Sequence, residues 1–303
     1  MNDGVRDEQL AALTTESARP ELADLDLRPT HELVRLMLDE QRAVDAALEA
    51  AAGSLERAVD AVAHRMRRGG RLLYLGAGTP GRLAALDAAE CPPTFGLDPG
   101  RVVALIAGGQ DALGGAREDA EDHGADAVAS LEAVGAGPDD AVVGISASGR
   151  TPYVLEGLRA ARALGCLTVA IANNAGAPIS GAAEVAIEVV TGPEVIAGST
   201  RLKAGTAQKV VLNALSTLVM VRLGRTFGNL MVDVRPGNEK LRDRAHRIVV
   251  EATGASTTAA GSALEAADGE TKVAVVMLLA GVDAAEARRR LSDGAGVREA
   301  LGG

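Results

Sequence analysis

Closely spaced glycines follow a short apolar run near residue 76. The segment GAGTPG (76–81) has a G-x-G-x-x-G spacing after an expected strand, which is typical of a dinucleotide site. Backbone N–H groups in such a turn bind phosphate, and the helix N-terminus behind it adds a favourable dipole. A dinucleotide site also needs an acid at the end of the next strand, and here that strand ends in LIAGGQ (105–110). The loop therefore favours a different phosphate, with Gly78 and Thr79 as candidate contacts, and a tight turn without ligand is the alternative.

A second loop combines hydroxyl groups with a helix start. The segment SASGRTPYV (146–154) places Ser146, Ser148 and Thr151 around Gly149, ahead of a helix that begins with proline. Hydroxyls and helix N–H groups together make a cradle for a phosphate monoester without any metal. The alternative is ordinary N-capping of that helix.

Two pairs of carboxylates are candidates for acid–base chemistry. Asp87 and Glu90 lie three residues apart, as do Glu118 and Glu121. A solvated helix face is the ordinary alternative for such acids. Glu90 stands out because the Pro-Pro pair at 92–93 predicts a rigid turn that would fix its direction. Two carboxylates from different strand–helix units could supply a general acid and a general base if burial separates their pKa values.

Continuous apolar runs predict the strands that must position these residues. The runs occupy residues 71–76, 102–108, 141–148, 167–174 and 185–190. Short apolar strands that alternate with helices indicate an α/β fold whose parallel sheet is covered on both faces. Ligands bind at the carboxyl ends of such strands, which is where both loops lie.

Helical segments are expected on both sides of this core. Residues 1–20 are polar and are expected to be extended, and apolar spacing over residues 30–68 predicts two helices with a break at Gly53-Ser54. Residues 200–224 predict one long, largely buried helix, and a link and a further helix follow over residues 231–254. The short helices of the tail are expected to start near Thr257, Glu270, Asp283 and Gly296.

Composition argues against several classes of protein. The chain has 303 residues, a net charge of −10 and 1% aromatic residues, whereas a nucleic-acid binder needs a basic face and stacking side chains. Cys91 and Cys166 are far apart and the four histidines are isolated, so neither a disulfide framework nor a metal site is expected. Without a signal peptide or a credible membrane span, we expect a cytoplasmic protein with no nucleic-acid or membrane partner.

Several long motifs, in one order, resemble the N-acetylmuramic acid 6-phosphate etherases. They are TESARP (15–20), LGAGTPGRLAALDAAECPPTFG (75–96), IAGG (106–109), EDAED (118–122), SASGRTPYV, EVIAGSTRLKAGTAQKVVLNALST (194–217) and MVDVRPGNEKLRDRA (231–245). The resemblance runs essentially end to end. It implies a flavodoxin-like sheet of the sugar isomerase (SIS) class, sandwiched by helices, that binds a phosphosugar and is usually part of a homodimer. The expected division is an N-terminal segment and helix over 1–54, the SIS domain over 55–236 and a small C-terminal helical subdomain over 237–303.

The resemblance also implies a reaction, that of a carbon–oxygen lyase without a cofactor. The D-lactyl ether of N-acetylmuramic acid 6-phosphate is eliminated and water is added, which gives N-acetylglucosamine 6-phosphate and D-lactate in the recycling of cell-wall amino sugars. Two alternatives on the same fold stay open. One is a phosphosugar isomerase, and the other is a non-catalytic phosphosugar sensor that is similar to the glucokinase regulatory protein.

Roles for single residues follow from the same resemblance. Glu90, in ECPPT, would be the proton donor, and a carboxyl half-buried against the two prolines would keep a raised pKa. Glu121, in AED, would be the base, with Glu118 as the fallback. The family usually has serine where this chain has Pro80, so the first loop lacks a hydroxyl and an N–H group. The implied substrate contacts are Gly78, Thr79, Ser146, Ser148, Gly149, Thr151, Glu194, Ser199, Thr200 and Lys203.

Overall fold

A computed structural model describes residues 13–115, 118–234, 239–292 and 295–302. The chain divides into two compact units, Met1–Asp87 with Val103–Leu215, and Ala88–Val102 with Ser216–Gly303. Each unit has its own hydrophobic core. Two helices, α4 (Gly78–Phe95) and α8 (Lys203–Arg222), contribute residues to both units.

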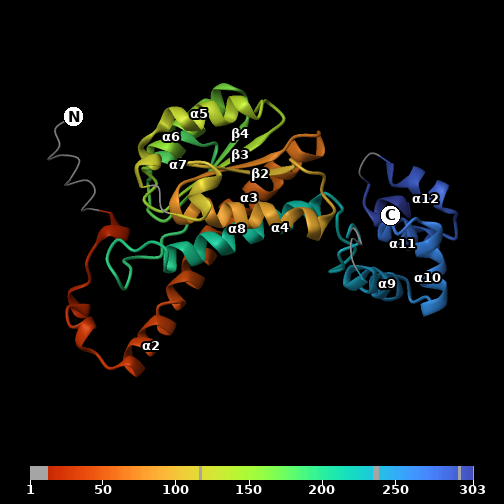
Figure 1. The fold of residues 1–303 in the computed structure, drawn as a ribbon, viewed down its shortest axis with the longest axis horizontal. Helices are drawn as coiled ribbons and strands as arrows, with labels where there is room; N and C mark the ends of the chain where they lie inside the picture. The colour runs from red at the N-terminus through yellow and green to blue at the C-terminus, as the bar shows by residue number, and fades with distance from the viewer. Residues whose placement is uncertain (1–12, 116–117, 235–238, 293–294, 303) are drawn as a thin grey trace. The chain divides into compact units, whose positions relative to one another are not determined.

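A five-stranded sheet forms the centre of the first unit (Figure 1). Its order is β2-β1-β3-β4-β5, and the pairs β1/β3, β3/β4 and β4/β5 are parallel. The bounds are β1 Leu72–Gly76, β2 Val102–Ile106, β3 Ala141–Ser146, β4 Leu167–Ala172 and β5 Val185–Glu188. All five predicted strands and the α/β class are therefore confirmed. The order reverses between β1 and β3, and in open α/β sheets ligands bind at such a switch point.

Helices cover both faces of this sheet. On one face, α5 (Gly124–Ala133) and α6 (Pro152–Ala163) pack together and α7 (Pro178–Ala182) lies beside them, while α3 (Arg42–Arg67) packs on the other face (Figure 1). The core under α5 and α6 is largely aliphatic, as the low aromatic content predicts; the fully buried aromatic residues are Tyr74 and Tyr153.

The N-terminal region differs from the expectation in two places. The helix break lies at Glu40-Gln41, between α2 (Thr30–Asp39) and α3, and Gly53-Ser54 is inside α3, so the predicted break was wrong. An interior glycine costs a helix only about 1 kcal/mol, and α3 buries a long apolar face that outweighs this cost. The segment expected to be extended, residues 1–20, instead contains a 3-10 turn at Thr14–Glu16, and two more such turns follow at Pro20–Leu22 and Leu25–Leu27; residues 1–12 lie outside the described residues.

The long predicted helix is α8, whose apolar side chains are mostly in the interior. It is long and apolar enough to cross a bilayer, with a mean hydropathy of 1.2 over its most apolar stretch, but 56% of that stretch is buried inside the structure. The buried residues include Ala204, Ala207, Val211, Leu215 and Val219. Such burial is typical of a core helix, as the sequence predicts.

The second unit contains the helical tail. Its helices are α9 (Glu239–Thr253), α10 (Thr257–Ala266), α11 (Thr271–Ala280), α12 (Ala284–Arg290) and α13 (Val297–Ala300). The predicted starts are confirmed, and two of them have side-chain caps. Ser256 Oγ accepts a hydrogen bond from the N–H of Ala259 at 3.2 Å, and Asp283 Oδ1 accepts one from Glu286 at 2.8 Å.

Candidate functional site

Three hydroxyl groups converge where β3 ends. The Ser146 Oγ lies 2.8 Å from the Oγ1 of Thr151 and 3.4 Å from the Oγ of Ser148, and it accepts the N–H of Gly149 at 3.0 Å. Gly149 has a φ of +70°, which lets the chain turn sharply there. Thr151 is the N-cap residue of α6 but makes no side-chain hydrogen bond to the helix. Its hydroxyl therefore faces the serines instead of capping α6, which favours the cradle over the capping alternative.

The glycine loop after β1 is shaped by close backbone packing. A Cβ atom at Gly76 would lie 2.8 Å from the N and Cα of Gly81, and one at Gly81 would lie 2.8 Å from the carbonyl oxygen of Gly76. These two glycines are needed because the end of β1 touches the start of α4. Pro80 lies in the first turn of α4, where a missing N–H has no cost. The outer glycines of the dinucleotide-like spacing thus have a packing role.

The structure brings the two loops together. Gly76 pairs with Ile145 in the parallel register of β1 and β3, so Ser146 follows directly beside the glycine loop. Both loops lie at the switch point of the sheet, and each leads into a helix N-terminus.

The segment before α8 adjoins the glycine loop. Glu194 is buried, and its two carboxylate oxygens accept the N–H groups of Lys203 at 3.1 Å and Ala204 at 2.9 Å, which fixes the start of α8. A Cβ atom on Gly205 would lie 3.5 Å from the Cγ2 of Thr79, so the first turns of α4 and α8 are neighbours. The predicted contacts Ser199 and Thr200 are partly exposed in this segment.

Lys203 faces the junction of α2 and α3. Its ammonium group forms an ion pair with Glu40, which also binds Arg19 at 2.6 Å. Burial alone would raise the pKa of Glu40, but its hydrogen bonds to Lys203 and Arg19 outweigh burial and lower it. The three side chains line a cavity of about 480 Å³.

Sequence reasoning missed the part played by the N-terminal turn Thr14–Glu16. The amide nitrogen of Asn174 donates to the Thr15 hydroxyl and to the carbonyl oxygen of Ala147, both at 3.0 Å. The carbonyl oxygen of Thr15 in turn accepts the N–H of Gly198 at 3.1 Å. The turn therefore connects the loop that carries Ser146, Ser148 and Thr151, called the hydroxyl loop below, to the segment before α8. The only signal in the sequence was a pair of asparagines at the end of a predicted strand.

The candidate base lies on the loop between β2 and α5. Glu121 is exposed in a short 3-10 turn, Glu118–Asp122, which packs against α6, and the fallback Glu118 begins the same turn.

Asp87 and Glu90 have different surroundings on α4. Asp87 is buried and accepts hydrogen bonds from the hydroxyl of Tyr74 at 2.8 Å and the amide of Asn213 at 3.0 Å, so it is not on a solvated helix face. Glu90 is exposed, in the part of α4 that belongs to the second unit.

The expected Pro-Pro turn and the half-buried Glu90 carboxyl were both wrong. The helix α4 continues through Pro92 and Pro93 to Phe95. The prolines occupy the last turn, where they deprive only two carbonyl groups of intrahelical donors. The hydroxyl of Thr94 donates to the carbonyl oxygen of Glu90 at 2.8 Å, which supports this last turn.

Among the described residues, no group of three or more His, Cys, Asp or Glu side chains could hold a metal ion.

Comparisons with known proteins first define a class. Two family models match, "Glucokinase regulatory protein N-terminal SIS domain" over residues 54–162 and "SIS domain" over residues 125–218. A solved phosphoheptose isomerase from Francisella tularensis is similar in fold, with a TM-score of 0.50 and 15% identity; the match covers 63% of this chain and 98% of that one. The sheet order and these matches place the chain in the SIS class of α/β proteins.

Curated relatives then define the family. The N-acetylmuramic acid 6-phosphate etherase of Rubrobacter xylanophilus is 56% identical over 296 residues, which is 98% of each chain. That of Streptomyces coelicolor is 57% identical over 288 residues, 95% of this chain and 93% of the relative. The chain belongs to the N-acetylmuramic acid 6-phosphate etherase family, as its motifs suggest.

Proposed function

We propose that this protein cleaves the D-lactyl ether of N-acetylmuramic acid 6-phosphate to N-acetylglucosamine 6-phosphate and D-lactate, as a step in the recycling of cell-wall amino sugars. One observation carries the proposal. The chain is 50–57% identical, over nearly its full length, to relatives that bear the etherase name. Glu90, Glu121 and the hydroxyl loop support it, because they supply the groups that this reaction needs.

The 6-phosphate would bind in the loop around Gly149. Ser146, Ser148 and Thr151 offer hydroxyl donors, and the N-terminus of α6 adds a positive dipole. This arrangement holds a phosphate monoester without a metal ion. Gly78 and Thr79, from the neighbouring loop, are proposed as further contacts, together with the segment that contains Glu194, Ser199, Thr200 and Lys203.

The chemistry would need one base and one acid. Glu121 removes the proton at C2 of the open-chain sugar, which the adjacent aldehyde makes acidic, so no cofactor is needed to accept electrons. The C3–O bond breaks, a C2=C3 double bond forms, and Glu90 protonates the departing lactyl oxygen. Water then adds its hydroxyl to C3 while C2 regains a proton. Both glutamates are exposed in the single chain, so substrate and water can reach them.

We also propose that the protein acts in the cytoplasm as a homodimer. The helix α2 supports a dimer because it contains no buried residue, although Val34, Met37 and Leu38 lie on it. Exposed apolar groups of this kind mark protein–protein contacts.

The direct test is to incubate the purified protein with N-acetylmuramic acid 6-phosphate and assay D-lactate, with and without EDTA. We expect lactate release that EDTA does not change. Folded protein that releases no lactate would contradict the proposal. Binding without turnover would then indicate a phosphosugar sensor, and aldose–ketose conversion of a sugar phosphate would indicate an isomerase.

A further inference from the structure

The end of α4, which carries Glu90, lies directly against the link that follows α8. Gly96 comes one residue after α4 and has a φ of +61°. A Cβ atom on Gly96 would lie 2.0 Å from the carbonyl oxygen of Asp233, so the two backbones touch and no side chain fits between them. The position of Asp233 therefore limits where α4 can end.

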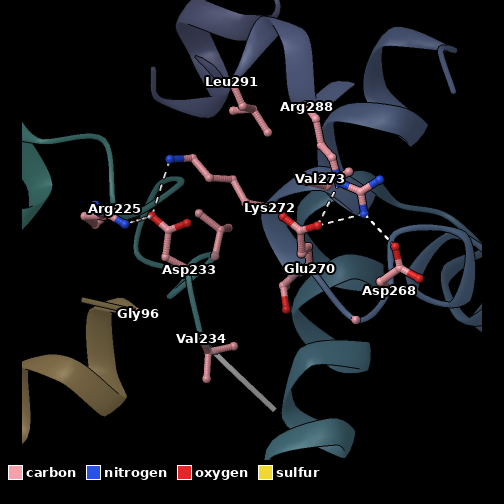
Figure 2. A pocket seen from close by; sticks show the side chains of 13 residues that line it. Gly96, Arg225, Asp233, Val234, Asp268, Glu270, Lys272, Val273, Arg288 and Leu291 are labelled. Atoms are coloured by element: carbon pink, nitrogen blue, oxygen red, sulfur yellow. Dashed lines mark hydrogen bonds and ion pairs between the residues drawn. The ribbon is translucent and has the colours of Figure 1, made fainter. Parts of the chain in front are cut away.

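Asp233 is itself held by two cations. Its Oδ2 lies 3.3 Å from the Nζ of Lys272, in the first turn of α11, and 3.6 Å from the Nη1 of Arg225, just after α8 (Figure 2). The side chains of Asp233 and Lys272 are only 14% and 12% exposed. Burial raises the pKa of Asp233 and lowers that of Lys272, as expected for a pair withdrawn from water. One carboxylate thus connects the end of α8, the start of α11 and, through its backbone, the end of α4.

A cavity beside Asp233 leaves one side of this ion cluster without packed side chains. The cavity has a volume of about 560 Å³ and is lined by Gly96, Asp233 and Lys272 among others. On its other wall, Arg288 binds Asp268 and Glu270 without touching Asp233 (Figure 2). Because open space adjoins Asp233, no side-chain packing holds it in place on that side. Its ion pairs with Lys272 and Arg225 hold it instead.

We propose that Asp233 and Lys272 are positioning residues for Glu90, acting through Gly96 on the end of α4. The inference rests on the proposed function, in which Glu90 protonates the departing lactyl oxygen. A general acid must lie within hydrogen-bond distance of its target, and a displacement of about 1 Å can cost roughly 100-fold in rate. Loss of the ion pairs that hold Asp233 would allow the end of α4, and Glu90 with it, to be displaced in this way.

The variants Asp233→Asn and Lys272→Met test the proposal by separating two steps of one reaction. We expect kcat for lactate release to fall at least about tenfold, because the general acid is misplaced. The KM should stay within about twofold, since the hydroxyl loop belongs to the first unit. Exchange of the C2 proton with solvent deuterium depends on Glu121, also in the first unit, and should change less than about threefold. Partial unfolding would lower both steps together.

Two further variants serve as controls. Lys272→Arg keeps the charge and should retain most of the wild-type kcat. If Asp233→Asn does not fold, the comparison of Lys272→Met with Lys272→Arg tests the proposal. Arg288→Met removes ion pairs from the same cavity without touching Asp233 and should leave kcat unchanged. Lactate release within about twofold of wild type in Asp233→Asn and Lys272→Met would overturn the proposal, as would a parallel loss of lactate release and exchange. A wild-type protein that releases no lactate would instead contradict the proposed function.

Discussion

At the scale of single residues, Ser146 is the centre of the hydroxyl loop. A hydroxyl has one donor and two acceptor sites, and the Oγ of Ser146 meets the N–H of Gly149 and the hydroxyls of Ser148 and Thr151. These neighbours orient the group before any ligand arrives. Ser146 is also buried, so a phosphate bound there would replace little water at this atom.

Replacing this hydroxyl should weaken substrate binding more than catalysis. We expect Ser146→Ala to raise KM about 10- to 100-fold, since a hydrogen bond to a charged group contributes about 1.5–3 kcal/mol. The kcat should change little, because the phosphate is remote from C2 and C3. Steady-state lactate assays give both constants. Ser292→Ala is a suitable control, because that hydroxyl donates to the carbonyl of Arg289 on an exposed surface; a lower kcat at unchanged KM in Ser146→Ala would contradict the assignment.

The choice between Glu121 and Glu118 as base is also a residue-scale question. We expect Glu121→Gln to abolish exchange of the C2 proton with solvent deuterium and to lower lactate release about 100-fold or more, because the amide cannot accept the proton. Glu118→Gln, in the same 3-10 turn, is the matched variant and should keep both activities. NMR of the sugar in D₂O measures the exchange. Exchange that persists in Glu121→Gln and is lost in Glu118→Gln would assign the base to Glu118.

At the scale of elements, an ion pair holds β1 and β3 at their first residues. Asp140 precedes β3, and its carboxylate accepts hydrogen bonds from the backbone N–H of Arg71 at 2.8 Å, the guanidinium of Arg71 at 2.6 Å and the N–H of Gly137 at 3.1 Å. Burial alone would raise the pKa of Asp140, but these bonds outweigh it and the pKa is lowered. Arg71, which directly precedes β1, is thus bonded to the residue that directly precedes β3.

The lowered pKa predicts how this contact depends on pH. A carboxyl whose pKa is lower in the folded state stabilises the fold fully above its unfolded pKa of about 3.9, and this stabilisation is lost as pH falls through the folded value. We expect Asp140→Asn to lower the free energy of unfolding by about 3 kcal/mol at pH 7 and by less below pH 4. Urea unfolding at both pH values checks this. A difference that is the same at pH 7 and pH 3.5 would mean that the charge of Asp140 is not its cause.

The sequence predicted elements better than it predicted where they stop. The five strands and the tail helices follow from apolar runs and capping residues, which are local signals. Gly53 and Pro92-Pro93 are local stop signals that the structure overrides, because burial of α3 and the position of the prolines in the last turn of α4 make them tolerable. The hydroxyl loop was predictable because its groups lie within six residues of one another. The bond from Asn174 to Thr15 joins residues 159 positions apart, and no local pattern indicates it.

At the scale of the whole molecule, the two glutamates proposed for the proton transfers fall in different compact units of the chain. Glu121 and the hydroxyl loop belong to the first unit and Glu90 to the second. The helices α4 and α8 are the elements that contribute to both. A change that disturbs α4 or α8 should therefore affect Glu90 and Glu121 differently. Lactate release reports on Glu90 and C2 exchange reports on Glu121, so the two are measured separately.

The oligomeric state is the remaining property at this scale, and the apolar face of α2 predicts it. Leu27, Val34 and Leu38 are 81%, 53% and 62% exposed in the single chain, on and just before a helix that buries nothing. We expect a mass twice the 30.7 kDa of one chain by light scattering. A charge within an apolar interface is unfavourable, so Leu38→Glu should yield a monomer, whereas Arg35→Gln on the same helix should not. A wild-type monomer would exclude the homodimer, and a Leu38→Glu dimer would place its interface away from α2.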